Sequence, residues 1–498
     1  MTDAPGAEPD RTRPPSFGRS AMISGGARLT AQVITWLVTL MTVRLLAPAD
    51  YGQAGLAMTI AFFASLVVDL GMAPAIQAMP EQSPRVLRQA NGLTTFVALA
   101  MAALLTLGGP VLANYFGEAR LRTLMVAAGL HCLLEGLRAV PTAVALRSFR
   151  FGAVARADFV RALVGSGVTI LLAWQGQGAW SVVGGAIAGS AVALAILQWD
   201  LRLSLAIPTW RQLSPLIAYG RLLLLGRLTW QGWVNADGVI VGRTAAMAAL
   251  GHFNVAKTFA QLPQEKLLSV FMGVTQSYLA AAADDRPALR RYFLELTELI
   301  AVGMGLPLLG LLATAHDVLP LVLGPNWHEA APLVQWLIPG AFLSCLGSLA
   351  NQVVIIRGRA AIPTAASTVA AVVAFPWFWG CAQIAGPRGV AAGTLAISLL
   401  INGPGLVDAL RQTGATAAEF AGRLRPLVLS GGLMLASLWG GRLLLQRFVS
   451  PDSVLSVACL VALGGTVGVF VALRVGGTGV DRLRTMLRLP SPSRQEAA

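Results

Sequence analysis

The residues of this chain that could do chemistry are charged side chains inside its long apolar stretches. The basic ones of most interest are Arg28, Arg227 and Lys257. An arginine at the centre of a membrane helix costs roughly 2.5–3.5 kcal/mol on insertion scales, so it normally faces a partner or a watery cavity. We expect these three side chains to line a polar cavity. The alternative is that carboxylates neutralise them or that they reach the membrane surface.

Two carboxylates, Asp69 and Asp237, lie in stretches of the same kind. A buried carboxylate can carry a proton or a sodium ion, so either residue is a candidate for ion coupling. The alternative, a structural salt bridge, is the interpretation that we favour for both. Asp237 lies ten residues along the chain from Arg227, or about 15 Å along one helix, which is too far for a direct pair.

Three further arginines, Arg138, Arg161 and Arg221, lie in or near apolar stretches. For these we expect neutralisation by a carboxylate or exposure at the membrane surface. Glu135 precedes Arg138 by three residues, which places both on one helical face and predicts that they pair.

The sequence contains no nucleophile elbow, P-loop, zinc-ligand cluster or large hydrophilic domain. These absences weigh against an enzyme and an ATP-driven pump, and they give no reason to expect a cofactor or a metal. The cysteines lie in apolar stretches without C-x-x-C or Cys/His spacing, so we interpret them as packing residues. They are Cys132, Cys345, Cys381 and Cys459.

The composition indicates which elements must position these side chains. Apolar residues make up 55% of the 498 residues and charged residues 12%, and the mean hydropathy is +0.67. The charged share is about half of the roughly 25% that is usual for a soluble domain. One or two soluble cores could not hide so much apolar surface from water, so the chain belongs in a bilayer. Its continuous apolar runs predict membrane-spanning helices.

Fourteen stretches are long enough to be such helices, and they divide the chain into two lobes and a final pair. We predict an N-lobe over residues 20–205, a C-lobe over 206–412 and a helix pair over 413–475, between tails at 1–19 and 476–498. The predicted spans are 20–46, 53–77, 89–114, 121–146, 153–174, 178–200, 214–242, 252–281, 289–314, 330–356, 360–383, 388–410, 422–446 and 453–474.

Arginines gather in alternate connecting segments of this arrangement. If the N-terminus faces the cytoplasm, the cytoplasmic segments hold most of the arginines and the opposite segments hold few. This positive-inside bias predicts that both termini are cytoplasmic. Orientation and contact with anionic membrane lipids also explain the net charge of +14. Nucleic acid is not an expected partner, because the basic residues form no patch interleaved with aromatic ones.

A repeat relates the two lobes. The residues at 28, 29, 30 and 32 recur 199 positions later as Arg227, Leu228, Thr229 and Gln231. Six predicted helices separate the two copies, so both run through the membrane in the same direction and the lobes are parallel repeats. Such lobes would meet at a central cleft, and Arg28 and Arg227 would face each other across it.

A second repeated motif has the pattern G-x-x-x-V-x-x-G-x-x-A. Its glycines are Gly178 and Gly185 in the first lobe and Gly386 and Gly393 in the second. We interpret all four as sites of close helix packing. The offset of this motif is 208, compared with 199 for the first repeat. The second lobe has therefore gained about nine residues between the two repeated segments.

Several motifs, in order along the chain, carry a resemblance to a known family. They are R-L-L-A-P-A-D-Y-G (44–52), V-D-L-G-M-A-P-A-I-Q (68–77), R-S-F-R-F (147–151), G-Q-G-A-W (176–180), D-G-V-I-V-G-R (237–243), L-G-H-F-N-V-A (250–256) and L-G-P-N-W-H-E-A-A-P-L (323–333). With these motifs the chain resembles the polysaccharide transporter family of the multidrug/oligosaccharidyl-lipid/polysaccharide (MOP) exporter superfamily, especially its Wzx-type and colanic-acid-exporter-like flippases.

The resemblance implies an all-α polytopic membrane protein with about 14 transmembrane helices, in two parallel six-helix lobes plus a C-terminal pair. It also implies alternating-access export of an undecaprenyl-pyrophosphate-linked oligosaccharide, a repeat unit of exopolysaccharide, capsule or O-antigen, across the bacterial inner membrane. The implied partners are this lipid-linked oligosaccharide, a coupling H⁺ or Na⁺, and the polymerase and export machinery. The alternatives are a cation-coupled multidrug exporter of the same superfamily and, less favoured, a membrane glycosyltransferase or polymerase.

The resemblance gives the polar residues roles that can be tested. Guanidinium groups match phosphate oxygens, so a cationic cleft would hold the pyrophosphate. Sugar hydroxyls would be bound by amides, although hydrogen bonding between helices is an equally good interpretation of those amides. Tryptophans could stack on sugar rings, but packing is their commoner use. The predicted cleft residues are Arg28, Arg227 and Lys257; the sugar contacts are Gln32, Gln231 and Asn235; and the ion-coupling residues are Asp69 and Asp237.

Overall fold

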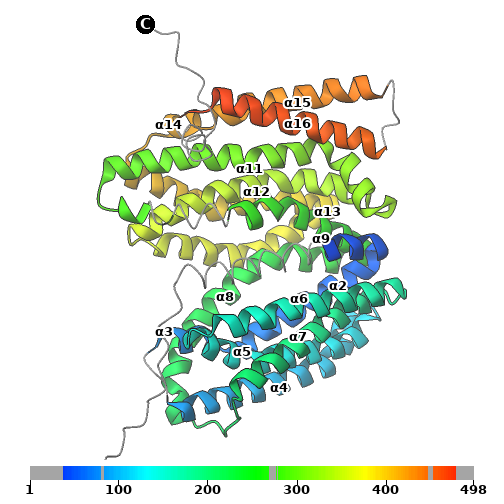
Figure 1. Cartoon of the computed structure of the whole chain (residues 1–498), viewed down its shortest axis with the longest axis vertical. Coiled ribbons are helices and arrows are strands. Elements are labelled where there is room, and N and C mark those ends of the chain that lie inside the picture. Colours follow the sequence, from blue (N-terminus) through cyan, green and yellow to red (C-terminus); the bar gives the residue numbers. More distant parts are fainter. Residues whose placement is uncertain (1–36, 80–82, 269–275, 277–278, 447–452, 478–498) are drawn as a thin grey trace, which may run out of the picture. The chain divides into compact units, whose positions relative to one another are not determined.

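The computed structural model describes residues 37–79, 83–268, 276, 279–446 and 453–477 (Figure 1). Every regular element in these ranges is helical. The predicted tail 1–19, residues 478–498 of the other tail, Arg28 and Gln32 lie outside the described residues. Among the described helices, ten are long and apolar enough to cross a membrane. The prediction of an all-helical protein that crosses the membrane many times is confirmed.

The helices of the first half follow a helical segment over residues 37–45. They are α2 (Pro48–Asp69), α3 (Met72–Ala78), α4 (Pro84–Phe116), α5 (Leu121–Arg147), α6 (Phe151–Trp174) and α7 (Ala179–Leu201). The predicted span 53–77 is wrong as one helix, because α2 and α3 are separated at Leu70 and Gly71, with φ of 49° and 69°. A Cβ on Gly71 would lie 2.2 Å from the carbonyl oxygen of Gly220, so only glycine fits this break.

The second half begins with the long helix α8. The elements are α8 (Trp210–Thr244), α9 (Met247–Pro263), the π-helix η1 (Gln264–Leu268), α11 (Arg286–Leu323), the 3₁₀-helix η2 (Pro325–Trp327), α12 (Ala330–Ile356), α13 (Ala361–Thr413), α14 (Ala417–Gly422), α15 (Arg425–Leu445) and α16 (Val454–Val475). The charged helix α8 and the helix α9 are not among the ten apolar spans. The predicted spans 360–383 and 388–410 both fall in α13, which departs from helical geometry at Ala385 and Gly386.

Local sequence explains where several helices begin and end. The side chains of Ser83, Asp285 and Ser453 accept hydrogen bonds from backbone N–H groups in the first turns of α4, α11 and α16. Such N-caps satisfy donors that have no partner inside the helix. Gly117, with φ of 68°, and Gly414, with φ of 72°, end α4 and α13 in the left-handed conformation that glycine adopts without strain.

The glycines of the repeated G-x-x-x-V-x-x-G-x-x-A motif are of two kinds. Gly178 has φ 54° and ψ −128°, and Gly386 has φ 56° and ψ −142°, so this repeated glycine marks a special backbone conformation and the packing interpretation is wrong for it. A Cβ on Gly185 would lie 1.8 Å from Thr169 Oγ1, and one on Gly393 would lie 2.9 Å from Cys381 Sγ. Close packing is therefore confirmed for this second pair.

Two compact units make up the chain. The first comprises residues up to 46 together with 57–227, and the second comprises 47–56 together with 228–498. Within the second unit, α2 and α9 cross at two glycines. A Cβ on Gly52 would lie 2.0 Å from the carbonyl oxygen of Met247, and one on Gly251 would lie 1.9 Å from that of Pro48. These contacts are equivalent under the 199-residue repeat, which supports the predicted duplication.

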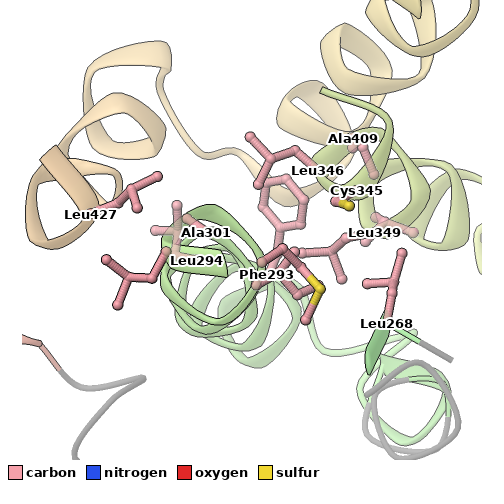
Figure 2. Packing of buried hydrophobic residues seen from close by; sticks show 14 of the residues in the cluster. Leu268, Phe293, Leu294, Ala301, Cys345, Leu346, Leu349, Ala409 and Leu427 are labelled. Atoms are coloured by element: carbon pink, nitrogen blue, oxygen red, sulfur yellow. The ribbon is translucent and has the colours of Figure 1, made fainter. Parts of the chain in front are cut away.

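The main hydrophobic core of the second unit lies among α11, α12 and α13. Figure 2 shows Phe293 of α11, Leu346 and Leu349 of α12 and Ala409 of α13 in one cluster, with Leu427 of α15 at its side. Two cysteines fit the packing interpretation, since Cys132 and Cys345 are buried, whereas Cys381 is partly buried and Cys459 is exposed on α16. The packing interpretation is therefore wrong for Cys459.

Two ion pairs hold α15 beside α11. Arg423 Nη1 lies 3.1 Å from Glu298 Oε2, and Arg442 Nη2 lies 2.6 Å from Asp317 Oδ1. Arg423 lies just before α15 and Arg442 near its end. Glu298 and Asp317 follow in the same order along α11, so α15 runs parallel to α11. Glu298 and Asp317 are about 28 Å apart along α11, close to the ~30 Å thickness of the hydrocarbon core. These pairs therefore lie where the two membrane surfaces are expected.

Candidate functional site

The first charged site is an ion pair in the first unit. Arg227 Nη1 of α8 lies 2.8 Å from Asp69 Oδ2, and the side chains are 47% and 11% exposed, respectively. Asp69 is the last residue of α2, and its Oδ1 accepts a hydrogen bond of 3.1 Å from the backbone N–H of Ala73. One carboxylate therefore caps α3 and neutralises Arg227. This is the salt-bridge alternative for both residues, and a cleft-lining role for Arg227 stays a prediction.

The second charged site is a more deeply buried pair in the second unit. Lys257 Nζ of α9 lies 2.7 and 2.8 Å from the carboxylate oxygens of Asp237 on α8 and 2.5 Å from the carbonyl oxygen of Val234. The Lys257 and Asp237 side chains are 17% and 5% exposed. The sequence suggested separate roles for these two residues, in substrate binding and in ion coupling. The structure joins them in one site.

This pair lines a cavity of about 550 Å³ inside the second unit. Small polar side chains on α12 and α13 form much of its wall, and they are Ser344, Ser348, Asn351, Thr394, Ser398 and Asn402. Sequence reasoning missed all of them. The signal was present, because spacings of three or four residues place side chains on one helical face.

Two asparagines of this wall pack over glycines of the opposite helix. A Cβ on Gly347 would lie 2.1 Å from Asn402 Oδ1, and one on Gly405 would lie 1.9 Å from Asn351 Oδ1. Asn351 Nδ2 donates to Asn402 Oδ1 over 3.5 Å. The Oδ1 of Asn351 is buried against Gly405 and accepts no hydrogen bond from the described residues.

Aromatic rings form another part of the wall. Trp230 and Trp233 line the cavity, with ring centroids 4.9 Å apart and planes at 78°. Gln231 and Asn235 are not among the residues that line it. Instead, Asn235 Nδ2 donates to Gln231 O over 3.0 Å and lies 3.4 Å from Gln231 Oε1. Their predicted contact with sugar stays a prediction.

The formal charge of the lining is −1, from two carboxylates and one ammonium group. Its charged members are Asp237, Glu265 and Lys257. Because Lys257 is neutralised by Asp237, this cavity is no cationic site for a pyrophosphate group. Hydroxyls, amides and indole rings together suit a ligand that carries many hydroxyl groups and apolar ring faces.

A polar network in the first unit is separate from both charged sites. Glu135 lies 3.0 Å from Arg138 and 3.0 Å from Arg161, and it accepts a hydrogen bond of 2.6 Å from Ser190 Oγ. The predicted pairing of Glu135 with Arg138 is confirmed, as is the neutralisation of both arginines. The network ties α5, α6 and α7 together.

The described helices define a polytopic helical membrane protein, and comparison with solved structures shows which fold it has. The lipid II flippase MurJ, in an inward closed conformation, has a TM-score of 0.72 at 11% identity, over 94% of this chain and all of that one. An inward-facing multidrug resistance MATE transporter of the MOP superfamily has a TM-score of 0.58 at 14% identity, over 77% of this chain and 95% of that one. At such identities the likeness shows the fold alone, and that fold is the predicted MOP type.

The family follows from sequence comparison. A family model described as polysaccharide biosynthesis protein matches residues 41–332, which is more than half of the chain. The chain therefore belongs to the polysaccharide biosynthesis protein family.

Curated relatives are distant. They include the teichuronic acid biosynthesis protein TuaB of Bacillus subtilis, 20% identical over 60% of this chain and 62% of its own length, and the succinoglycan biosynthesis transport protein ExoT of Rhizobium meliloti, 22% identical over 59% and 60%. The lipopolysaccharide biosynthesis protein WzxC of Escherichia coli is 24% identical over 77% of this chain and 79% of its own. The chain thus spans about three fifths of the length of TuaB and ExoT.

Proposed function

We propose that this protein carries an undecaprenyl-pyrophosphate-linked oligosaccharide across the bacterial inner membrane by alternating access. The observation that carries the proposal is the cavity of the second unit, which is lined by hydroxyls and amides of the membrane-spanning helices α12 and α13 and by two indole rings of α8. Family membership and the names of the relatives support a role in polysaccharide biosynthesis.

The chemistry of such a substrate divides it into parts. Its long apolar tail can stay in lipid, whereas its sugars and pyrophosphate cannot cross hydrocarbon without polar partners. The cavity of the second unit fits the sugars, since Trp230 and Trp233 offer ring faces and the hydroxyl side chains of α12 and α13 offer hydrogen bonds. The pyrophosphate requires cations, and for these we retain Arg28 and Arg227.

The pair of Asp237 and Lys257 suits a coupling role. A proton or sodium ion that arrives at Asp237 competes with Lys257 for the same two carboxylate oxygens, which lie 2.7 and 2.8 Å from Nζ. Binding of the cation would release Lys257 towards an anionic substrate, so that ion and substrate bind together. Removal of product by downstream polymerisation is a second source of driving energy.

The second candidate is a cation-coupled multidrug exporter. Glu265 favours it, because a second carboxylate in the cavity wall suits a cationic drug. The row of hydroxyls and amides on α12 and α13 favours the oligosaccharide, since few drugs could satisfy so many hydrogen-bonding groups.

The test is complementation of a strain that lacks the gene. Without the protein, lipid-linked oligosaccharide should accumulate on the cytoplasmic leaflet. The cavity variant Thr394→Ala with Ser398→Ala should lower export roughly tenfold through lost hydrogen bonds to sugar. The matched control is Thr364→Ala with Thr368→Ala, which changes exposed residues of the same helix and should export normally.

The double variant Arg28→Ala with Arg227→Ala tests the pyrophosphate site in the same strain. Normal export by this variant at normal protein levels would contradict the cationic-cleft hypothesis. Normal levels of surface polysaccharide in the strain that lacks the gene, with efflux of cationic dyes lost, would favour the drug exporter instead.

A further inference from the structure

The R-S-F-R-F motif forms a strained turn between α5 and α6. Phe149 has φ of 55°, which is unfavourable for a bulky residue and is tolerated where the surrounding structure enforces it. Arg147 Nη1 donates to the carbonyl oxygen of Ile76 over 2.6 Å and so ties the turn to α3. The turn leaves Phe149 72% and Phe151 40% exposed, with ring centroids 5.9 Å apart. Neither the proposed function nor the core uses these aromatic rings.

A cavity of about 650 Å³ opens beside this turn, between the start of α6 and the end of α7. Its wall is partly cationic and partly apolar, and it is formed by Arg150, Gly152, Ala153, Ala155, Arg156, Phe159 and Asp200. A Cβ on Gly152 would meet no heavy atom of another part of the chain within 4 Å. The cavity is therefore open at this point. All of these residues belong to the first unit.

Asp200 orients the two arginines of the cavity. Arg156 Nη2 lies 2.8 Å from Asp200 Oδ2, and Arg150 Nη1 donates to the backbone carbonyl of Asp200 over 3.3 Å. Each arginine uses one side-chain nitrogen in these bonds, whereas a guanidinium group carries five N–H donors. The Arg156 side chain is 68% exposed. With one carboxylate against two guanidinium groups, the cavity keeps a net positive charge and donors for an oxyanion.

An exposed stripe continues from this cavity along α6. Leu163, Leu171 and Trp174 are 50%, 50% and 78% exposed, and they follow Gly152, Arg156 and Phe159 at spacings that keep to one helical face. Beyond Arg156 these members of the stripe are uncharged. A ligand with a charged head and an apolar tail would match the cavity and the stripe together.

Aromatic residues indicate that this face contacts lipid. At one end of the α6–α7 hairpin Phe149 and Trp199 are exposed, and at the other end Trp174 and Trp180 are exposed. Aromatic side chains at both ends of a membrane helix pair are typical of the two membrane–water interfaces. Basic pockets between helices at the cytoplasmic surface are typical headgroup sites.

We propose that this cavity binds the phosphate of an anionic phospholipid through Arg150 and Arg156, with an acyl chain along the stripe on α6. Phe149 and Phe151 anchor the turn at the level of the headgroups. The proposal does not depend on the nature of the transported substrate, because the site is built from residues that the proposed function does not use.

Native mass spectrometry of the full-length protein in detergent tests this proposal. Phosphatidylglycerol and phosphatidylcholine of matched acyl chains are titrated separately, and bound lipids are counted. We expect phosphatidylglycerol to bind roughly tenfold more tightly, because its headgroup has a net negative charge. The variant Arg150→Gln with Arg156→Gln should lose this preference.

Two further variants separate the site from general effects. Arg122→Gln removes an exposed arginine at the start of α5 and should keep the preference. Gly152→Leu leaves the charge unchanged but fills the cavity, so it should weaken phosphatidylglycerol binding. Equal affinity of the native protein for both lipids, or an equal loss in Arg122→Gln, would overturn the proposal. Displacement of phosphatidylglycerol by equimolar undecaprenyl pyrophosphate would also overturn it, since the occupant would then be the lipid carrier.

Discussion

The pairs Asp69–Arg227 and Asp237–Lys257 are not related by the internal repeat, although α8 contributes to both and the other helices, α2 and α9, correspond to each other. In the first unit, Asp69 pairs with the half-exposed Arg227. In the second, Asp237 pairs with Lys257, and both side chains are largely buried. Under the offset of 199, Asp237 corresponds to Val38 and Lys257 to Met58. The repeated halves therefore kept their helices and changed their chemistry.

The glycines at the crossing of α2 and α9 behave in the opposite way. Gly52 and Gly251 correspond under the repeat, and each lies against a backbone carbonyl of the other helix. Backbone contact of this kind tolerates no side chain, so both copies must keep glycine. A polar site can diverge in one copy alone. Glycines found in both halves thus indicate the architecture that the halves share. Charged residues found in one half only indicate a function specific to that half.

The largest effect on stability is expected at the buried pair of the second unit, which has no charged counterpart in the first half. Asp237→Asn leaves the Lys257 ammonium without its counter-charge, which should cost about 3–5 kcal/mol of folding free energy. The double variant Asp237→Val with Lys257→Met has at these positions the residue types of Val38 and Met58, their counterparts in the first half. It should recover most of that stability and still fail to export.

Melting temperatures in detergent and export in the complemented strain measure these two properties. Full export by the apolar double variant would show that the pair is only structural. Failure of this variant to regain stability would show that the two halves no longer share the packing around these positions.

The next effect concerns the shared glycines. Gly52→Ala and Gly251→Ala should each destabilise the protein by about 1–3 kcal/mol, because the new methyl group overlaps a backbone carbonyl. The melting temperature should fall by similar amounts in both. Gly226→Ala and Gly232→Ala on α8 are the controls, since a Cβ there meets no other atom within 4 Å. Unequal losses at Gly52 and Gly251 would contradict an equivalent crossing.

A smaller loss is expected at the pair that fixes α15, a helix without a counterpart in the first half. Asp317→Asn removes the carboxylate partner of Arg442, whose side chain is 41% exposed and can turn towards solvent. We expect a loss of about 1 kcal/mol. Exchanging the charges by Asp317→Arg with Arg442→Asp should restore the melting temperature. No recovery would mean that these residues act through packing.

Much of the architecture was predictable because it rests on local patterns. Apolar runs predicted the helices, and close packing was predicted for Gly185 and Gly393, whereas the special backbone conformation of Gly178 and Gly386 was not. The break at Gly71 was missed, because its cause is contact with Gly220, far along the chain. The pairing of Arg138 with Glu135 was predictable from a spacing of three residues.

The candidate site was harder to predict, since ion pairing joins residues on different helices. Asp69 and Arg227 are 158 positions apart, and no periodicity relates such positions. The row that contains Ser344 and Ser348 had a helical spacing that indicated one face, but serine also bonds to its own helix, as Ser348 does. Only packing shows that this face lines a cavity.

The smallest change in stability, and the most informative comparison of function, is expected at Arg227. Its side chain is 47% exposed, so Arg227→Lys should cost under about 1 kcal/mol. If Arg227 only neutralises Asp69, lysine suffices and export is normal. If it binds pyrophosphate, export should fall several-fold, because an ammonium group lacks the bidentate fork that matches phosphate oxygens. Arg221→Lys, at an exposed arginine of the same helix, is the matched control. Export measured at equal protein levels decides between a structural and a substrate-binding role, since both variants keep the charge of α8.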